Sequence, residues 1–265
     1  IIDFVDAVSM MYERRIQTVN SLWDKFKIGI EFLKVKNYEK KCCKIFKTQT
    51  VISKFDKEYI ENFAKKTNIS VIGNGVDTEY FKPMEAEKKN NICFVGSMQY
   101  IPNSEAAKYF ATEVFPKIKN VIPNAKFKII GANPRKELFE ITKDIEGIEI
   151  TGRVEDVREY MKDSSVSVCP VRIAGGIQNK ILEAMSMGIP VVTTSEGAEG
   201  IGADENILVV AKNNEDYANK VMELMQNEQV QKEISVKSRE FILKNFSWSG
   251  IGINLKTLIL EEKND

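Results

Sequence analysis

Residues 166–192 read VSVCPVRIAGGIQNKILEAMSMGIPVV, and this stretch decides the fold. It begins with an apolar run at residues 166–170, passes through a loop with two adjacent glycines and continues as an amphipathic helix over residues 177–188. A second apolar run starts at Val191. Runs that are apolar throughout are typical of strands in a parallel sheet covered on both faces. The stretch therefore predicts a strand-helix-strand unit.

The same alternation continues from residue 92 to residue 227. Further strands are predicted at residues 92–96, 126–131, 148–151, 191–194 and 206–210. Further helices are predicted near residues 104–115, 134–145, 157–162 and 215–227. We therefore expect a doubly wound, Rossmann-like parallel sheet, which binds ligands beyond the carboxyl ends of its strands.

The first quarter of the chain predicts a smaller α/β segment. Residues 1–6 read as a buried strand without an initiator Met, so we expect the sequence to begin within a protein. Helices are predicted at residues 21–36, 38–47 and 57–66, and short strands at residues 48–53 and 69–72. Turn residues at 73–77, Pro83 and a polar stretch at residues 84–91 predict a linker.

Composition excludes several classes of function. The chain has 265 residues, 43% of them apolar, and balances 38 Lys and Arg against 38 Asp and Glu. This apolar fraction supports a folded core, and the balanced charge argues against a nucleic-acid binder. The chain contains no His, which excludes a Ser-His-Asp triad, a His-ligated zinc and a His base within these residues. No apolar run is long enough to span a bilayer. The four cysteines form no CxxC pair and no disulfide framework, so we expect them to be buried thiols in a cytoplasmic protein.

Charge is concentrated near the start of the chain. Residues 11–66 carry fourteen Lys and Arg against seven Asp and Glu, a net charge of +7. This segment favours an anionic partner such as a membrane, a phosphorylated acceptor or a polyphosphate. Within it, Leu22, Trp23, Phe26, Ile30 and Leu33 share one face of a predicted helix, with other apolar residues opposite. Such a helix is either an ordinary buried helix or one that rests on the core and presents its second face to anionic lipid.

The loop at residues 170–180 is the strongest candidate site. Two glycines let the backbone approach a ligand, and a helix that starts near Ile177 exposes free N–H groups and the positive end of its dipole. Arg172 and Lys180 add positive charge, so phosphate is the expected ligand. Glu183 lies about one turn past Asn179 and has the reach to accept hydrogen bonds from ribose hydroxyls. The pattern predicts a nucleotide site, although the same residues alone also fit a glycine loop with an exposed Lys and a solvated Glu. No GxGxxG or GxxxxGK[ST] motif is present.

The sequence resembles family GT4 of the GT-B glycosyltransferases, also called glycosyl transferases group 1, over most of its length. The motifs that carry the resemblance are IGNGVD at 72–77, FVGSM at 94–98 with PN at 102–103, GRVEDV at 152–157, GIQNK at 176–180 with LEAM at 182–185, GIPVV at 188–192, EGAEGI at 196–201 and FSW at 246–248. The nearest branch contains the sugar transferases of exopolysaccharide and surface-glycan assembly. Two features depart from the family. The family commonly has Glu, and this branch tends to have Arg, where this chain has Gly175. The Arg and Lys pair that many members have after the first strands of this domain is not evident.

The resemblance implies a GT-B fold with a defined division of the chain. Residues 1–75 correspond to the last part of a Rossmann-like N-terminal, acceptor-side domain, which is incomplete. Residues 76–245 correspond to the nucleotide-sugar-binding domain, and residues 246–265 to a helix that crosses back to the first domain.

The resemblance also implies roles for individual residues. Glu183 would hold the ribose hydroxyls, and Arg153 and Val154 would contact the base. The candidate donor-binding residues are Gly96, Ser97, Met98, Asn103, Gly152, Arg153, Val154, Gly175, Gly176, Ile177, Gln178, Asn179, Lys180 and Glu183. Arg172 and Lys180, which we take in place of the family's Arg and Lys pair, and Glu183 are the candidate catalytic residues. Asp3 and Asp6 are candidate acceptor-side residues, with a capping or structural role as the alternative.

The implied activity is transfer of a sugar from a UDP- or GDP-sugar to a glycan or lipid-linked acceptor in surface polysaccharide biosynthesis. We expect no metal, no cofactor and no nucleic-acid partner. The expected location is the cytoplasm, with peripheral attachment to the inner face of the membrane as a further expectation. The alternatives are a non-catalytic nucleotide-binding module and a GT-B epimerase or phosphorylase.

Overall fold

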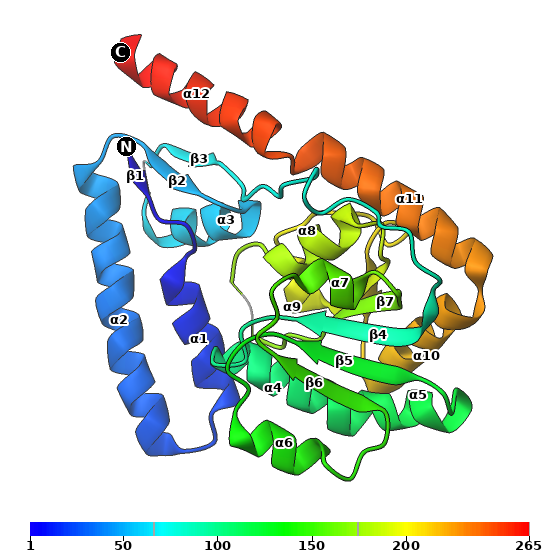
Figure 1. The fold of residues 1–265 in the computed structure, drawn as a ribbon. Helices are drawn as coiled ribbons and strands as arrows, with labels where there is room; N and C mark the ends of the chain where they lie inside the picture. Colours follow the sequence, from blue (N-terminus) through cyan, green and yellow to red (C-terminus); the bar gives the residue numbers. More distant parts are fainter. Residues whose placement is uncertain (66, 174, 265) are drawn as a thin grey trace.

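The computed structural model of the protein describes residues 1–65, 67–173 and 175–264. These residues form a three-stranded sheet in the first part of the chain and a six-stranded sheet in the rest, and every strand pairing is parallel. Figure 1 shows the two sheets with helices around each, and the last helix lying along the outside of the smaller sheet. The predicted α/β class is confirmed.

The smaller sheet has the strand order β1-β2-β3, from β1 (Ile2–Asp3), β2 (Gln49–Val51) and β3 (Ile69–Val71). The helices are α1 (Val8–Thr18), α2 (Leu22–Ile45) and α3 (Lys54–Phe63). The helix predictions were less accurate than the strand predictions here. The chain forms one long α2 where two helices were predicted, and α1 was not predicted.

The prediction of a buried strand over residues 1–6 is wrong for most of that run. β1 covers only Ile2–Asp3, and Ile1 and Val5 are 49% and 46% exposed. β1 lies at the edge of the described sheet, and Val5 adopts a φ of 63°. A β-branched residue rarely takes that conformation, so the chain turns sharply at Val5. The residues after it leave the sheet.

The larger sheet has the strand order β6-β5-β4-β7-β8-β9. Its strands are β4 (Lys89–Val95), β5 (Lys126–Ile130), β6 (Ile148–Gly152), β7 (Ser164–Cys169), β8 (Val191–Thr194) and β9 (Val209–Ala211). Each predicted strand of this region overlaps an observed one. The chain runs outward from β4 to β6 and then restarts at β7 on the other side of β4, so the order reverses between β4 and β7. This doubly wound order is the predicted one.

Helices cover both faces of the larger sheet (Figure 1). They are α4 (Ile101–Tyr109), the π-helix η1 (Phe110–Val114), α5 (Phe115–Val121), α6 (Lys136–Thr142), α7 (Val157–Met161), α8 (Asn179–Ser186), α9 (Ser195–Ala198), α10 (Asn214–Gln226) and α11 (Glu228–Asn245). The segment α4-η1-α5 extends beyond the predicted helix. Pro116 lacks an N–H group, and the chain accommodates it by a wider turn in which the Phe115 N–H donates to the Phe110 carbonyl. The core between these helices and the sheet contains Phe94, Phe110, Phe127 and Tyr217, all fully or almost fully buried.

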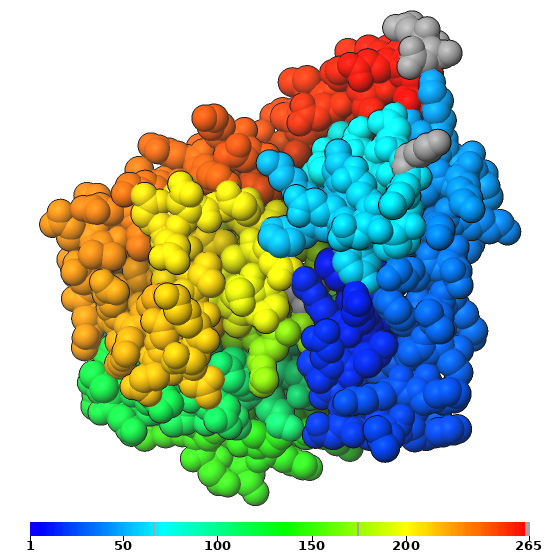
Figure 2. All heavy atoms as spheres, turned by 180° about the vertical axis from the view of Figure 1, so that it is seen from behind, coloured from blue at the N-terminus to red at the C-terminus, as the bar shows by residue number. Residues whose placement is uncertain are grey.

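The last helix, α12 (Trp248–Asn264), joins the two parts of the chain. Val76 pairs with Ser247 in a single parallel bridge, and the Trp248 ring packs against Gly75. Further along, the Thr48 hydroxyl donates to the Glu262 carboxylate, which ties α12 to the smaller sheet. An ion pair at 2.6 Å between Arg14 of α1 and Glu199, just after α9, links the two parts again. Figure 2 shows, from behind, the first part packed directly against the second.

Helix α2 is exposed along the apolar face that was predicted from the sequence. The side chains of that face are between 39% and 83% exposed; they are Leu22, Trp23, Phe26, Ile30 and Leu33. Ile28, Phe32 and Val35 on the opposite side are half-buried. Within the described residues, α2 is therefore not a buried helix. None of the described helices combines the length and apolarity needed to cross a membrane, and the four cysteines are buried free thiols, as predicted.

Candidate functional site

A cavity of about 550 Å³ opens where the order of the larger sheet reverses. It lies beyond the carboxyl ends of β4, β5 and β6 and beside the start of α8. Its lining residues are Phe81, Val95, Gly96, Ser97, Asn103, Gly131, Ala132, Arg153, Val154, Val157, Ile177, Gln178, Asn179, Lys180 and Glu183. This is the place at which a doubly wound sheet binds its ligand.

Most of the predicted donor-binding residues line this cavity, and some do not. Gly152, Gly175 and Gly176 stand outside the lining, and the Met98 side chain is fully buried. Met98 contributes through its backbone, because its N–H donates to the Ala132 carbonyl and holds the loops after β4 and β5 together. The lining residues that sequence reasoning missed are Phe81, Val95, Gly131, Ala132 and Val157. Val95 and Val157 stand within the family motifs at residues 94–98 and 152–157, and Ala132 stands in a loop after a predicted strand. Phe81 and Gly131 stand outside these motifs.

The loop after β4 is shaped by Asn103 and two glycines. The Asn103 side chain donates to the Ser97 carbonyl at 3.1 Å, which ties the start of α4 to the loop. A Cβ at Gly96 would lie 2.6 Å from Asn103 Nδ2, and a Cβ at Gly131, whose φ is +148°, would lie 1.9 Å from the Gly96 carbonyl oxygen. Only glycines allow this approach, so the family motif at this loop has a packing reason.

The start of α8 brings the main polar groups of the cavity together. None of the described side chains caps this helix. The Ile181 N–H donates to the Gln178 carbonyl at 2.9 Å, and the N–H groups of Asn179 and Lys180 before it remain available to a ligand. The Lys180 ammonium donates to Gln178 Oε1 at 3.0 Å, which places its charge beside the helix start. Both the helix and Lys180 therefore favour an anion here.

Glu183 faces the same cavity from one turn along α8. Burial raises the pKa of its carboxyl above the usual 4.5, and the charge of Lys180 opposes part of that effect. Among the described residues, none donates a hydrogen bond to this carboxylate. The Glu183 oxygens are therefore available to hydroxyl groups of a ligand.

The two arginines of the prediction are placed differently. Arg153 is exposed and lines the cavity. Arg172 stands outside the lining, with its guanidinium carbon 5.2 Å from the centre of the Tyr109 ring. The structure thus brings Lys180 and Glu183 together but does not bring Arg172 to them.

The two predicted acidic residues near the start of the chain, Asp3 and Asp6, have different surroundings. The Asp3 carboxylate accepts hydrogen bonds from the Thr50 hydroxyl at 2.8 Å and the Val5 N–H at 3.2 Å, which is the structural alternative foreseen for it. Asp6 lies against Gly176, and a Cβ built at Gly176 would stand 1.9 Å from Asp6 Oδ1. Asp6 therefore contacts the loop that directly precedes the cavity-lining residues, and it is not itself one of them.

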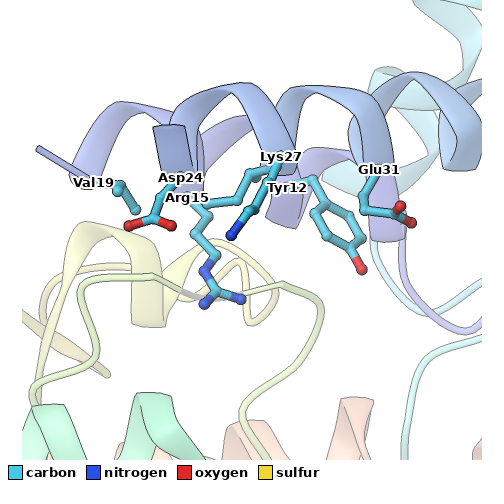
Figure 3. Close-up of a pocket in the computed structure, with 7 residues that line it drawn as sticks. Tyr12, Arg15, Val19, Asp24, Lys27 and Glu31 are labelled. Atoms are coloured by element: carbon cyan, nitrogen blue, oxygen red, sulfur yellow. The ribbon is translucent and has the colours of Figure 1, made fainter. Parts of the chain in front are cut away.

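A second hollow, of about 350 Å³, lies between α1 and α2 and contains none of the predicted site residues. Figure 3 shows Arg15 and Lys27 beside Asp24, with Tyr12 between them and Glu31. Two basic and two acidic side chains line this hollow. Among the described residues, no group of three or more Cys, Asp or Glu is arranged to hold a metal ion.

Comparison with known proteins gives the family. Residues 89–227, more than half of the chain, match the sequence model of the family described as glycosyl transferases group 1. The chain belongs to the group 1 glycosyltransferases. The matched region runs from β4 to the end of α10, so it contains the cavity-lining loops apart from Phe81.

One curated glycosyltransferase is similar to the chain in sequence, and solved structures are similar to it in fold. An uncharacterized glycosyltransferase of Methanocaldococcus jannaschii is 28% identical over 222 residues, which are 81% of this chain and 59% of that protein. Sucrose-phosphate synthase from Thermosynechococcus elongatus has the same GT-B fold, with a TM-score of 0.79, 16% identity and coverage of 99% of this chain and 68% of that one. HepE from Anabaena, solved with UDP and glucose, has a TM-score of 0.73 with 12% identity, over 86% of this chain and 67% of that one. The chain spans between 42% and 59% of the length of the curated relatives it matches.

Proposed function

We propose that this group 1 glycosyltransferase transfers a sugar from a nucleoside diphosphate sugar, a UDP- or GDP-sugar, and that the cavity at the start of α8 binds the donor. One observation carries the proposal: an uncapped helix start, the Lys180 ammonium and the unpartnered Glu183 carboxylate face one cavity. The first two suit a diphosphate, and the third suits the vicinal hydroxyls of ribose. The complex of HepE with UDP and glucose, which has the same fold, supports this choice.

The proposed chemistry follows from the charges. Breaking a bond between a sugar and a phosphate develops negative charge on the departing diphosphate. Fixed N–H groups at the start of α8 and the Lys180 ammonium stabilise that charge more in the transition state than in the ground state. Arg153, which also lines the cavity, adds a second cation near the nucleotide. We therefore assign transition-state stabilisation to Lys180 and the helix start, and ribose binding to Glu183.

The acceptor that we propose is a glycan or lipid-linked glycan of surface polysaccharide assembly. This part of the proposal rests on the family resemblance of the motifs from residue 72 to residue 248. The match to the group 1 family favours a sugar transferase over a GT-B epimerase or phosphorylase.

Two measurements test the proposed donor. Calorimetric titration with UDP, GDP, ADP and uridine should show one nucleoside diphosphate that binds much more tightly than the nucleoside, because the α8 start recognises the diphosphate. Incubation with nucleotide sugars should then release free sugar slowly without an acceptor. Intact nucleotide sugar together with tight binding would identify a non-catalytic binding module instead.

A second proposal concerns location, and the exposed face of α2 favours it. We propose that this face docks on an anionic membrane surface. Trp23 and Phe26 are 64% and 59% exposed and stack on each other, and the Lys27 ammonium lies 5.3 Å from the Trp23 ring. An exposed apolar stripe with cations beside it suits the boundary between headgroups and acyl chains.

Co-sedimentation with vesicles tests the docking of α2. Binding should require anionic phosphatidylglycerol, weaken as salt is raised and fall in a Trp23→Ala, Phe26→Ala double variant. Tyr38→Ala is the matched control, because Tyr38 is equally exposed on α2 but outside the stripe. Equal binding to neutral vesicles, or equal loss in the control, would contradict the proposal.

A further inference from the structure

Asp6 is a carboxylate without a hydrogen-bond partner at the boundary between the two parts of the chain. Its Oδ1 atom is buried and has no hydrogen-bond partner among the described residues. Burial, with a smaller contribution from Asp56, raises the pKa of Asp6 from its usual 3.8 to about 6. A buried carboxylate oxygen without a donor is costly, so it needs an explanation.

The neighbouring acidic residues show that the fold satisfies such groups elsewhere. The Asp56 carboxylate accepts from the Ala7 N–H at 2.8 Å and from the Ser53 hydroxyl. The Glu39 carboxylate accepts from both the N–H and the hydroxyl of Ser9. Both residues are turned into the first part of the chain, and Asp6 alone of these three acids is left unsatisfied.

The position of Asp6 indicates what its donor is. The strained turn at Val5 takes Asp6 away from the first sheet and against Gly176, which directly precedes the cavity-lining residues Ile177–Lys180. Burial raises the pKa of Tyr100, in the loop after β4, and the nearby negative charge of Asp6 adds a smaller contribution. Asp6 thus approaches, from the first part of the chain, the two loops of the second part that flank the proposed diphosphate position.

We propose that the Asp6 carboxylate accepts a hydrogen bond from a hydroxyl of the sugar that the donor carries. This inference rests on the proposed function and deepens it. Within a nucleoside diphosphate sugar, the diphosphate is repelled by a carboxylate, and the ribose hydroxyls are assigned to Glu183. The remaining hydroxyls belong to the transferred sugar, which is attached to the diphosphate that we place at the α8 start. Asp6 therefore completes the donor site across the boundary between the two parts.

The test distinguishes the contribution of the sugar to binding from the contribution of the nucleoside diphosphate. The 265-residue chain is titrated at pH 8 with UDP, GDP and a panel of their sugar derivatives, and the affinity ratio between the best sugar nucleotide and its own nucleoside diphosphate is measured. Asp6→Ala and Asp6→Asn should each lower this ratio about tenfold and leave the affinity for the diphosphate alone within about twofold, as expected for loss of a charge-assisted hydrogen bond. The control Asp3→Asn removes a nearby carboxylate that is already hydrogen-bonded, and it should change neither value.

The outcomes are distinct. A ratio that stays unchanged in both Asp6 variants overturns the inference, including the case in which Asp6 serves the acceptor or only the fold. Loss of affinity for the diphosphate and the sugar nucleotide in equal measure also overturns it. Failure of every nucleoside diphosphate to bind the unaltered chain would instead overturn the proposed donor site, and this inference with it.

Discussion

Asp6 Oδ1 and the Cα of Gly176 are in such close contact that a Cβ at Gly176 would lie 1.9 Å from the Asp6 oxygen. This contact joins the end of β1 to the loop that precedes α8. The first part of the chain therefore packs directly against the loop that precedes the proposed donor cavity. The glycine pair at 175–176 has a second contact of this kind, because a Cβ at Gly175 would lie 2.9 Å from Met11 Cγ.

Gly176→Ala tests this contact. The new methyl group meets Asp6 and Ile52 at a φ of +58°, so we expect a loss of roughly 2 kcal/mol of unfolding free energy, measured by urea denaturation. Gly202→Ala is the matched control, because Gly202 has a φ of +66° with no atom within 4 Å of its Cβ position. Adding Asp6→Ala should recover part of the loss at Gly176 and none at Gly202. Equal costs at the two glycines would show that backbone strain, not the contact, is responsible.

Asp6→Asn should stabilise the protein in a pH-dependent way. The pKa of Asp6 is about 6 in the folded chain against a usual 3.8, so the folded chain holds the proton more tightly than the unfolded chain. The Asp6 contribution to the unfolding free energy therefore decreases as pH rises from about 4 to 6, and its full penalty is present above pH 6. Removing the charge should raise the unfolding free energy at pH 8 by roughly 1–2 kcal/mol, with allowance for partial exposure of the side chain, and change it little at pH 4. Denaturant titrations at both pH values measure this, and destabilisation at pH 8 would refute it.

Lys180 and Arg172 should differ in their effect on nucleotide binding. Lys180→Met removes a cation from the cavity and should weaken UDP or GDP binding about tenfold, or about 1.4 kcal/mol. Arg172→Met should change the affinity less than twofold, because Arg172 packs on Tyr109 outside the cavity lining. Calorimetric titration of both variants decides the point. Equal losses of nucleotide affinity in the two variants would show that Arg172 also belongs to the binding site.

Arg14 and Glu199 should be energetically coupled. Their ion pair spans the two parts of the chain at 2.6 Å, and both side chains are 24% exposed. A double-mutant cycle with Arg14→Met and Glu199→Gln should give a coupling of about 0.5–1 kcal/mol, reduced at high salt. Additive effects of the two substitutions in urea denaturation would show that the pair does not hold the two parts together.

Much of the larger sheet and its cavity was predictable because the sequence patterns that indicate them are local. The strands from β4 to β9 are short apolar runs, and Glu183 and Lys180 stand on a helix whose amphipathic pattern is plain, so their common cavity follows from strand order. Helix α11 was missed although Val230, Ile234 and Ile242 pack on the core, because the fully buried position between them is polar, Ser238. The roles of Arg172 and Asp6 depend on contacts between distant segments, with Tyr109 and Gly176, and no spacing along the chain reveals them.

Binding of a nucleoside diphosphate to the Glu183 site tests the central claim most directly. Calorimetry should show that Glu183→Ala weakens the preferred nucleoside diphosphate at least about tenfold, or about 1.4 kcal/mol. Its 2′,3′-dideoxy analogue should bind the variant and the unaltered chain equally, because the hydroxyls that Glu183 holds are then absent. Glu155→Ala, which removes an exposed acid outside the cavity lining, should have no effect on either ligand. Failure of UDP, GDP and ADP all to bind, or an unchanged affinity in Glu183→Ala, would contradict the assignment of the donor site.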